Sequence, residues 1–481
     1  MPSTARRTPR REAAPDRSYT EALERLFRRR RFGMRPGLEV IEALLAELGN
    51  PESAYPSVHI AGSKGKGSVT ALVAEVLVAA GGPTGMYTSP HLQSYRERIR
   101  VDGVPISAED VTTGLMRVEE AAAKVAIARA DLHEPTFFEL TTALAFAHFA
   151  GRKVRHAAIE VGLGGEFDAT NVLRAPVAVI STIELEHTDV LGPTLTDVAR
   201  AKAGILHPGM RAVTAEAKGE PLAEIERRAA HLGVPLWHLG REVQIAEREL
   251  DEDGQRFTVV TPHAEHPRLS IPLLGAFQAR NAALAVAAID LFTEAVGFKV
   301  SDAALRRGLG AVRWRGRLER IAGKPALYLD AAHTPESARA LAEGLGEIAP
   351  FLDPEENALL FGCLHGKRVD AMLEPLSTLA RTLVLVPIRS DRSESVRELK
   401  RAALGRFPRI IVAPDAEQGL KLARAATSPT GLTVATGSDY LVGEILNALE
   451  GGPTGEPDLS DPLLRTPGQD ERATASRRRA K

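Results

Sequence analysis

The sequence predicts an α/β protein of two domains, each built on a mostly parallel sheet, and three observations lead to this prediction. Strand-like and helix-like segments alternate along most of the chain, which is typical of parallel sheets covered by helices. A glycine-rich turn connects the first clear strand to a helix, and a second strand–helix series starts after a polar stretch near residue 315. The length of 481 residues also exceeds what one compact core usually holds.

The N-terminal elements follow from hydrophobic periodicity and from helix-end signals. A strand over residues 57–60 leads through the turn into a helix over residues 68–80, which Gly81 and Gly82 end. Thr136 and Glu139 form a capping-box pattern that begins another helix. The apolar run of this helix covers residues 140–150, and other apolar runs predict strands at residues 157–161 and 177–183 and a helix at residues 279–292. We assign these elements to an N-terminal domain over residues 18–314.

The C-terminal series begins after the polar stretch RWRGRLER at residues 313–320. Its apolar runs predict strands at residues 326–329, 358–361, 383–386, 410–412 and 432–435, with helices between them and a last helix at residues 440–449. This alternation is typical of a Rossmann-like αβ domain. We assign residues 315–450 to this second domain.

The composition excludes several classes of protein. Lysine and arginine number 61 against 62 aspartates and glutamates, so no overall charge favours nucleic acid or a membrane surface as a partner. The chain lacks an apolar run of about 18 residues, so no membrane-spanning helix is expected. The single cysteine, Cys363, lies in an apolar run, which indicates a buried side chain in a reducing compartment and predicts a cytoplasmic protein.

Both ends of the chain differ from the rest. Residues 1–17 are rich in arginine and proline and lack the apolar segment of a secretory signal. Residues 451–481 are rich in proline, glycine and charge. Both are predicted to be disordered tails, and binding of a polyanion by their arginines is the alternative.

The glycine-rich turn is the first candidate site. Because it follows a strand and opens a helix, its backbone N–H groups can surround a phosphate. A lysine in such a loop can reach the β- and γ-phosphates, and a serine hydroxyl can bind Mg²⁺. Gly67 separates Lys66 from Ser68, which departs from the strict phosphate-loop pattern, and a basic surface turn is the alternative. The candidate residues are Gly62, Ser63, Lys64, Gly65, Lys66, Gly67 and Ser68.

Four more polar residues lie near predicted strand ends or on an apolar helix face. Glu160 stands near the C-terminal end of a strand, at the edge where parallel sheets bind ligands, and a carboxylate there suits Mg²⁺. Ser89 and His187 follow other strands, and Lys202 interrupts an apolar face. Each has a structural alternative: a satisfied polar residue for Glu160, a structural histidine for His187, and a snorkelling surface lysine for Lys202.

As an ordered set, these segments resemble the folylpolyglutamate synthase/dihydrofolate synthase family of the Mur ligase superfamily. The resemblance covers about residues 18–450, and its specificity comes from the order of the motifs rather than from any one of them. The motifs are HIAGSKGKGSV (59–69), YTSPHL (87–92), RERIRVDG (96–103), TFFELTTALAF (136–146), EVGLGG (160–165), DATN (168–171), KAGI (202–205), GAFQARNAALA (275–285), GRLE (316–319), DAAHTP (330–335) and TGSDYLVGE (436–444). The resemblance implies a P-loop ATPase-type N-terminal domain and a C-terminal ligase domain.

The resemblance also implies an ATP site and two Mg²⁺ sites. Lys66 and the backbone of the turn would hold the ATP phosphates. One Mg²⁺ would be bound by Ser68, Ser89 and Glu160, and a second by Glu160, His187 and Lys202. Further nucleotide contacts would come from Asn281, Arg317, Asp330 and His333. The implied catalytic residues are Lys66, Glu160, His187 and Lys202.

The lysine that matches Lys202 is typically carbamylated in this family. The modification turns an ammonium into an anionic oxygen ligand, which removes the repulsion that an unmodified lysine would meet beside two metal ions. We therefore expect a carbamate on Lys202.

The implied reaction joins L-glutamate to dihydropteroate or to the glutamyl tail of a folate, through an acyl phosphate formed with ATP. Thr136, Phe138 and Asp168 match positions that hold the pterin end of the substrate in the dihydrofolate synthase branch. The ring of Phe138 is a suitable stacking surface for a flat pterin. The resemblance implies small-molecule substrates, no nucleic acid or membrane partner, and a monomer.

The sequence departs from the family pattern at six positions. Lys64 stands where the family usually has Asn, and it adds a charge beside the phosphates. The other departures are Glu166 for Arg, Glu186 for Asp, Ala201 for Glu, Ala331 for Gly and Thr334 for Asn. None of them removes an implied metal ligand or Lys66, so they affect substrate detail more than catalysis.

Two other functions stay open at this point. One is another amino-acid ligase of the same superfamily, such as a peptidoglycan-precursor ligase, although the TSPHL and TFFELTTALAF stretches favour the folate branch. The other is a nucleotide-binding regulator without catalysis, against which the complete set of implied metal ligands argues.

Overall fold

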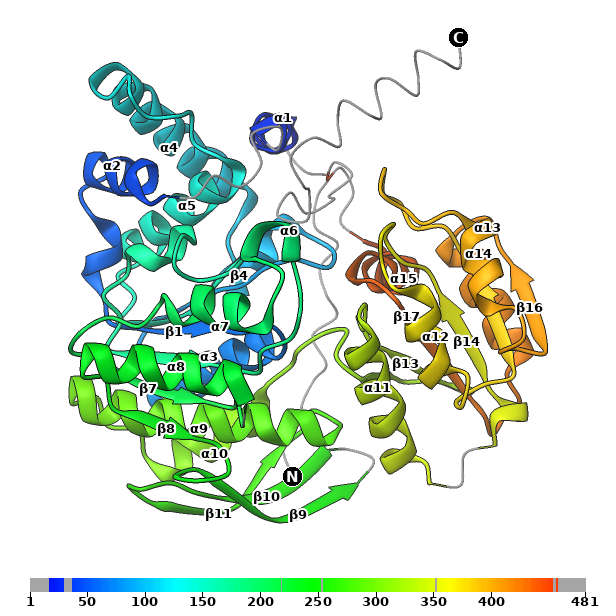
Figure 1. Cartoon of the computed structure of the whole chain (residues 1–481). Helices are drawn as coiled ribbons and strands as arrows, with labels where there is room; N and C mark the ends of the chain where they lie inside the picture. Colours follow the sequence, from blue (N-terminus) through cyan, green and yellow to red (C-terminus); the bar gives the residue numbers. More distant parts are fainter. Residues whose placement is uncertain are drawn as a thin grey trace, which may run out of the picture.

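The computed structural model describes residues 17–29, 37–217, 219–251, 254–350, 353–452 and 456, which form two α/β domains side by side (Figure 1). The α/β fold with mostly parallel sheets that the sequence predicts is confirmed. The predicted tails lie outside the described residues, except for Arg17, Gly451, Gly452 and Glu456. No helix within the described ranges is long and apolar enough to cross a membrane.

The N-terminal domain is built on an eight-stranded sheet in the order β4-β3-β2-β5-β1-β6-β7-β8. β1 lies between β5 and β6 and pairs parallel with both, whereas β2, β3 and β4 pair antiparallel at one edge. Every residue of β1, β5 and β6 is buried, because helices cover both faces. The strands are β1 (Ser57–Ala61), β2 (Thr84–Tyr87), β3 (Ile99–Val101), β4 (Val104–Pro105), β5 (His156–Glu160), β6 (Val177–Ile180), β7 (Arg211–Thr214) and β8 (Leu236–His238).

Helices cover the two faces of this sheet in separate groups. α3, α9 and α10 pack together on one face, while α5 with α1, α2 and α4 lies beside α7 and α8 on the other. The helices are α1 (Arg17–Arg28), α2 (Glu39–Glu47), α3 (Lys66–Ala80), α4 (Ala108–Ala128), α5 (Phe137–Gly151), α6 (Thr188–Leu191), α7 (Leu195–Ala203), α8 (Gly219–Leu232), α9 (Ala276–Val296) and α10 (Asp302–Ala311). The predicted capping box at the start of α5 is present, since Thr136 and Glu139 exchange both hydrogen bonds.

A small antiparallel sheet, which the sequence analysis did not predict, packs against α9. It consists of β9 (Gln244–Asp251), β10 (Gly254–Val260) and β11 (Glu265–Ile271). Its strands carry many charged side chains, so their alternation is weak, but Phe257, Leu269 and Ile271 are fully buried on the face toward the core. This sheet extends the N-terminal domain without contributing to the edge where ligands are expected.

The C-terminal domain is built on a six-stranded sheet in the order β12-β13-β17-β14-β15-β16, which is parallel apart from β12. One face packs against α11, α12 and α13, and the other against α14 and α15. The strands are β12 (Glu319–Ile321), β13 (Ala326–Leu329), β14 (Ala358–Phe361), β15 (Thr382–Leu385), β16 (Arg409–Val412) and β17 (Leu432–Thr436). The helices are α11 (Pro335–Ile348), α12 (Val369–Leu376), α13 (Val396–Ala403), α14 (Ala416–Ala426) and α15 (Asp439–Glu450).

Two predicted element ends shift where the phosphate-loop segment meets the sheet. The strand predicted over residues 177–183 ends at Ile180, because Thr182 forms an isolated bridge with Lys64 instead of continuing the sheet. The helix predicted from Ser68 begins at Lys66. Both shifts come from the glycine-rich turn, which folds over the end of β6.

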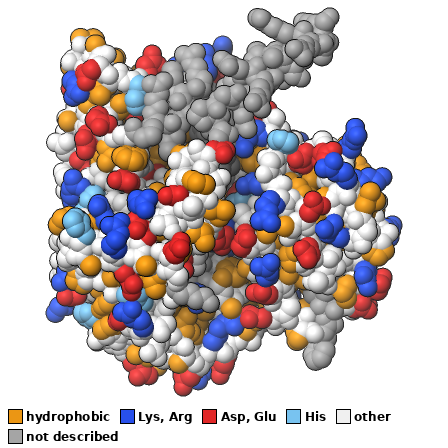
Figure 2. Space-filling model, in the orientation of Figure 1, with side chains coloured by type: hydrophobic (Ala, Val, Ile, Leu, Met, Phe, Trp, Pro, Cys, Tyr) orange, Lys and Arg blue, Asp and Glu red, His pale blue; other side chains and the backbone are white. Residues whose placement is uncertain are grey.

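The two domains contact each other beyond the connecting segment at residues 312–318. Gln93 Nε2 donates to Asn447 Oδ1 of α15 at 3.0 Å, and Leu92 packs against the core of the C-terminal domain. Glu456, which follows α15, returns to the N-terminal domain, where its carboxylate accepts hydrogen bonds from the Tyr19 hydroxyl (2.9 Å), the Tyr95 N–H (2.9 Å) and the Ser94 hydroxyl. Acidic and basic side chains alternate over the face drawn in Figure 2, without an extended patch of one sign.

Candidate active site between the two domains

The glycine-rich turn joins β1 to α3 and can be formed only by small residues at two positions. Gly62 and Gly65 have left-handed φ values of 138° and 85°. A Cβ atom on Gly62 would lie 1.8 Å from Ser181 Oγ, and one on Gly65 would lie 2.4 Å from Asn281 Oδ1. The turn is therefore pressed against β6 and α9, and it presents its backbone and the N-terminus of α3 to the space between the domains.

The side chain of Lys66 closes over the turn to which it belongs. Its Nζ atom donates to the carbonyl of Gly62 at 2.9 Å. The hydroxyl of Ser63 and the backbone of Glu184 are also hydrogen-bonded, at 2.9 and 3.2 Å, which ties the turn to the segment after β6. A phosphate in the turn would thus meet a lysine that is already held above it.

Three oxygen-bearing side chains from different elements line the cavity beside the turn. Glu160 ends β5, Ser89 follows β2, and Ser68 lies in the first turn of α3. Glu160 Oε2 accepts the backbone N–H of Ser89 at 3.0 Å. Burial raises the pKa of Glu160 to about 7, although the nearby charge of Lys66 lowers it. A buried carboxylate is costly to ionise without a positive partner, so Glu160 is suited to bind a cation. Together with the two serine hydroxyls it gives a set of hard oxygen donors, which fits Mg²⁺.

The second set of predicted metal ligands does not fit a metal ion as it stands. Lys202 on α7 is 1% exposed, and its Nζ atom lies 2.8 Å from Glu186 Oε1 and 2.9 Å from the carbonyl of Gly62. It is therefore an ammonium in an ion pair, which would repel a cation. Within the described ranges, no group of three or more histidine, cysteine, aspartate or glutamate side chains is arranged to hold a metal ion.

Burial and the ion pair determine the protonation of this second set. Burial lowers the pKa of Lys202 to about 8 against the opposing effect of Glu186. For Glu186, burial acts to raise the pKa, but Lys202 and then Lys66 and Lys64 outweigh it and hold the pKa well below its usual range. Burial lowers the pKa of His187 to about 4, so its imidazole is neutral near pH 7.

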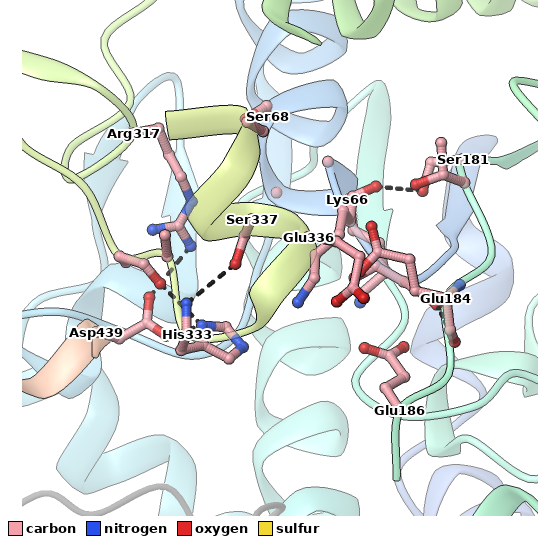
Figure 3. A pocket seen from close by; sticks show the side chains of 18 of the residues that line it. Lys66, Ser68, Ser181, Glu184, Glu186, Arg317, His333, Glu336, Ser337 and Asp439 are labelled. Atoms are coloured by element: carbon pink, nitrogen blue, oxygen red, sulfur yellow. Dashed lines mark hydrogen bonds and ion pairs between the residues drawn. The ribbon is translucent and has the colours of Figure 1, made fainter. Parts of the chain in front are cut away.

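The C-terminal domain presents a polar wall opposite the turn. Arg317 Nη2 donates to Asp439 Oδ1 at 3.2 Å, and these two residues lie beside His333 in Figure 3. Asp330 accepts the N–H groups of Leu318 (2.7 Å) and Ala332 (2.8 Å). Burial raises the pKa of Asp330 to about 6, against the opposing charge of Arg317. Thr334, where the family usually has Asn, caps α11 with its hydroxyl, so this departure preserves the start of the helix.

These walls enclose a cavity of about 370 Å³, which is the size of a small-molecule site. Thirteen of the predicted site residues line it, and Gly62 and Lys202 lie just behind this lining. The lining residues are Ser63, Lys64, Gly65, Lys66, Gly67, Ser68, Ser89, Glu160, His187, Asn281, Arg317, Asp330 and His333. Most residues that the sequence pattern singled out for ATP and metal therefore share one space, to which both domains contribute.

The three predicted pterin contacts lie outside the lining of this cavity. Thr136 caps α5, and Phe138 is 7% exposed and packs near Tyr87, with ring centroids 6.1 Å apart. The carboxylate of Asp168 accepts the N–H groups of Leu163 (2.8 Å) and Thr170 (3.0 Å). These side chains form the wall behind Glu160, because a Cβ atom on the adjacent Gly162 would lie 2.3 Å from the Phe138 ring.

Several polar residues that line the cavity were not predicted as site residues. Glu184 and Glu336 add carboxylates, Lys367 adds an ammonium, Gln278 adds an amide and Asp439 pairs with Arg317. Lys367 and Glu184 both follow strands of parallel sheets, so the strand-end rule that singled out His187 would have found them as well.

Comparison with known proteins gives a consistent result along the chain. Residues 60–289 match the family model of the Mur ligase middle domain, and residues 316–439 match that of the Mur ligase glutamate ligase domain. The chain is 32% identical over 434 residues to the dihydrofolate synthase/folylpolyglutamate synthase of Bacillus subtilis, covering 90% of this chain and 99% of that protein. The match to the Mycobacterium tuberculosis protein of the same name is 36% identical over 387 residues, covering 77% of this chain and 78% of the relative.

Solved structures agree with the sequence relatives. Mycobacterium tuberculosis folylpolyglutamate synthase complexed with ADP superimposes with a TM-score of 0.84 at 32% identity, covering 90% of this chain and 98% of that chain. Escherichia coli FolC in complex with DHPP and ADP superimposes with a TM-score of 0.79 at 28% identity, covering 92% and 99%. Both likenesses extend over both domains and so include the cavity between them.

Proposed function

Since the chain belongs to the folylpolyglutamate synthase/dihydrofolate synthase family of Mur ligases, we propose that the cavity between its domains is where ATP activates a folate-type carboxylate and L-glutamate is joined to it. The protein is an ATP-dependent ligase of folate metabolism. The observation that carries the assignment of the site is the convergence of the Lys66 turn, Glu160 and Arg317 on one cavity.

The proposed reaction has two steps, formation of an acyl phosphate and its attack by an amine. A carboxylate oxygen of the acceptor attacks the γ-phosphorus of ATP, the bond from that phosphorus to the β,γ-bridging oxygen breaks, and ADP leaves. The α-amine of L-glutamate then attacks the carbonyl carbon of the acyl phosphate, the carbon–oxygen bond to phosphate breaks, and the amine loses its proton. Two anions meet in the first step, so Lys66 and the N-terminus of α3 contribute by stabilising the phosphoryl charge.

We propose that Ser68, Ser89 and Glu160 hold Mg²⁺ together with ATP. The ion would supply charge neutralisation between the phosphates. The residues fit this role because the Glu160 carboxylate is already oriented by the Ser89 N–H and has only Lys66 and more distant arginines to offset its burial. With one carboxylate in the set, several coordination positions are left for phosphate oxygens and water.

A second Mg²⁺ at Glu160, His187 and Lys202 is proposed only for the carbamylated lysine. The neutral imidazole of His187 can act as a ligand. Lys202 can join these metal ligands when its Nζ carries a carboxyl group. The carbamylated side chain would then no longer pair with Glu186. The lowered pKa of Lys202 supports this proposal, because the neutral amine is the form that reacts with CO₂.

We propose that the pterin end of the acceptor lies against the wall formed by Thr136, Phe138 and Asp168. The DHPP complex of the Escherichia coli relative supports a pterin-type acceptor. Oδ1 of Asp168 already accepts the N–H and the hydroxyl of Thr170, so Oδ2, which accepts the N–H of Leu163, would receive a pterin N–H group. We also propose a domain boundary near residue 315, a monomeric state and a cytoplasmic location. The cytoplasmic location fits a protein that uses ATP and has a reduced cysteine, Cys363.

The test measures phosphate release with ATP, Mg²⁺ and L-glutamate, and compares dihydropteroate, tetrahydrofolate and no acceptor. Release is expected only when both L-glutamate and a pterin acceptor are present, and the preferred acceptor identifies the branch. Activity with a nucleotide-linked sugar in place of the pterin acceptors would instead favour a peptidoglycan-precursor ligase. ATP binding without release in any mixture would favour a regulator.

A further inference from the structure

Two lysines face the cavity from opposite domains. Lys64 belongs to the glycine-rich turn, and Lys367 to the loop between β14 and α12. Both residues are half-buried. Throughout the residues placed in the structure, neither ammonium has a hydrogen bond or an ion pair. Lys64 lies near Glu184 and Glu186, and Lys367 lies near Asp439, but neither ammonium is held by a direct contact. Two cavity-facing ammonium groups with free N–H donors can bind an anion.

The two lysines are close enough for their charges to interact. Burial lowers the pKa of Lys367, and the next largest cause is the charge of Lys64. Burial also lowers the pKa of His333 far below its usual range, followed by the charges of Lys64 and Lys367. Nδ1 of His333 donates to the carbonyl of Ala331 at 2.8 Å, and the lowered pKa keeps the imidazole neutral, so it does not compete for the anion. An anion between the lysines would relieve their repulsion.

The ATP phosphates have partners of their own. In the proposed function, Lys66 and the backbone of the turn would hold them from the N-terminal domain, at the start of α3. Lys367 approaches from the other domain, at the end of β14. The anion that Lys64 and Lys367 share is therefore expected to be the other charged reactant, and the incoming L-glutamate carries two carboxylates.

Glu184 supplies the opposite charge that an amino acid also requires. Its side chain lines the cavity, and its Oε2 atom is buried without a hydrogen-bond partner. In Figure 3, Glu184 and Glu336 lie on one side of the cavity, with Arg317 and Asp439 on the other. After burial, the charges of Lys64 and Glu336 have the largest influence on the pKa of Glu184, the first lowering it and the second raising it. A carboxylate oxygen without a donor is a suitable acceptor for an ammonium.

We propose that Lys64 and Lys367 bind a carboxylate of the incoming L-glutamate and that Glu184 binds its α-ammonium. This proposal rests on the proposed function and identifies residues for its second substrate. The site is divided between the domains, so the amino acid is held only where the turn of one domain and the β14 loop of the other lie together. Release of the ammonium proton would then free the amine for attack on the acyl phosphate.

The experiment separates activation of the acceptor from use of L-glutamate. Hydroxylamine replaces L-glutamate and captures the acyl phosphate as a hydroxamate, so the first step is measured without the amino acid. The variants are Lys64→Asn, which restores the usual family residue, Lys367→Met and Glu184→Gln. The matched control is Lys299→Met, at an exposed position far from the cavity lining.

Each of the three variants is expected to raise KM for L-glutamate about tenfold or more, as for the loss of a charge-assisted contact. For Lys367→Met and Glu184→Gln, KM for ATP and the rate of hydroxamate formation should stay within about twofold of wild type, as should every value for Lys299→Met. Lys64→Asn changes the phosphate-binding turn, so it should raise KM for L-glutamate by a larger factor than KM for ATP. Lys64→Arg should recover most of the affinity for L-glutamate, because it restores the charge. Preference for L-glutamate over L-glutamine should fall in Lys64→Asn if the bound group is the side-chain carboxylate, and stay if it is the α-carboxylate.

A different result overturns the proposal. If Lys64→Asn raises KM for ATP and slows hydroxamate formation in the same proportion, Lys64 is a nucleotide ligand. An unchanged KM for L-glutamate in Lys367→Met and Glu184→Gln removes both residues from the amino-acid site. If the wild-type protein forms no hydroxamate, the ligase chemistry at this cavity fails instead, which is a separate outcome. Thermal unfolding and ADP binding of each variant identify any loss that comes from misfolding.

Discussion

The ammonium of Lys202 and the carboxylate of Glu186 form a 2.8 Å ion pair beneath the glycine-rich turn, where the carbonyl of Gly62 accepts a second hydrogen bond from the same lysine. The pair is almost fully buried on the lysine side. Glu186, which is one of the departures from the family pattern, neutralises the ammonium of Lys202. Without this carboxylate, the ammonium would face the metal ligands as an unpaired cation. The unmodified lysine thus has a stable partner that a carbamate must displace.

Carbamylation of Lys202 is the first prediction. Incubation with ¹³C-bicarbonate at pH 8 should give a carbamate carbon signal that is absent from Lys202→Arg. Lys202→Ala should lose activity by about 10²-fold or more, as for the loss of a group beside the transferred phosphoryl. Short carboxylic acids should restore part of that activity, because they supply the missing anionic oxygens. Equal activity of Lys202→Arg and wild type would rule out a role for the modification.

The second prediction concerns Lys66. Lys66→Met should lower the rate of ADP formation by about 10²–10³-fold, because we propose that the amine held over the turn stabilises the charge of the transferring phosphoryl group. The loss should appear in kcat as well as in KM for ATP. Steady-state ADP formation with saturating acceptor and L-glutamate measures it, and a rate near that of wild type would contradict the site.

The third prediction uses the contact between Gly67 and Trp314. A Cβ atom on Gly67 would lie 2.8 Å from Cζ2 of the Trp314 indole, so Gly67→Ala should displace the turn or the linker and cost about 1–3 kcal/mol of unfolding free energy. ADP binding should weaken in parallel. The control is Gly310→Ala near the end of α10, where the added methyl meets nothing within 4 Å. Trp314→Phe in the Gly67→Ala background should recover part of the loss, which a double-mutant cycle measures.

The fourth prediction is a pH dependence of stability from Asp330. Burial raises its pKa from 3.8 to about 6, so the folded protein holds a proton that the unfolded chain has lost. The associated stability is fully present below about pH 4 and is lost as the pH rises through 6, to a limit of about 3 kcal/mol. Asp330→Asn should remove this slope from the unfolding free energy measured between pH 4 and 7. It should also lower stability at every pH, because one of the two N–H donors loses its acceptor.

The fifth prediction tests the pterin wall. Phe138→Leu should raise KM for dihydropteroate while KM for ATP stays near that of wild type, because Phe138 lies behind Glu160 and outside the lining of the ATP cavity. The volume change is small, so the fold should be retained with a cost of about 1 kcal/mol. A proportional rise of both KM values would mean that the ring supports Glu160 rather than the acceptor.

The sequence was sufficient for the architecture where apolar runs are long and buried on both faces. The strands at residues 326–329 and 358–361 are found at the predicted residues, because each is fully enclosed by helices or nearly so. The sheet formed by β9, β10 and β11 was not predicted, since one face of it carries charges and its register depends on packing against α9.

The site could be predicted in part for a similar reason. Residues of the turn and of the strand ends share an edge by the rules of parallel sheets, so Lys66, Ser89 and Glu160 were brought together as expected. The partner of Lys202 could not be read from the chain, because Glu186 is sixteen positions away and their contact depends on how the segment after β6 folds. Lys367 and Glu184 each follow a strand, but their place in one cavity depends on how the two domains pack against each other.

The contact of Glu456 with Tyr19 and Tyr95 ties the two halves of the polypeptide together, in addition to the covalent linker and the Gln93–Asn447 hydrogen bond. A protease that cuts the linker at residues 312–318 would therefore produce two fragments that still migrate together in a native gel. Removal of the chain after α15 would delete the Glu456 contact and leave the linker, the Gln93–Asn447 hydrogen bond and the packing of Leu92. A fusion partner is better placed beyond residue 456 than directly after Glu450, because the anchoring side chain of Glu456 then stays in the protein.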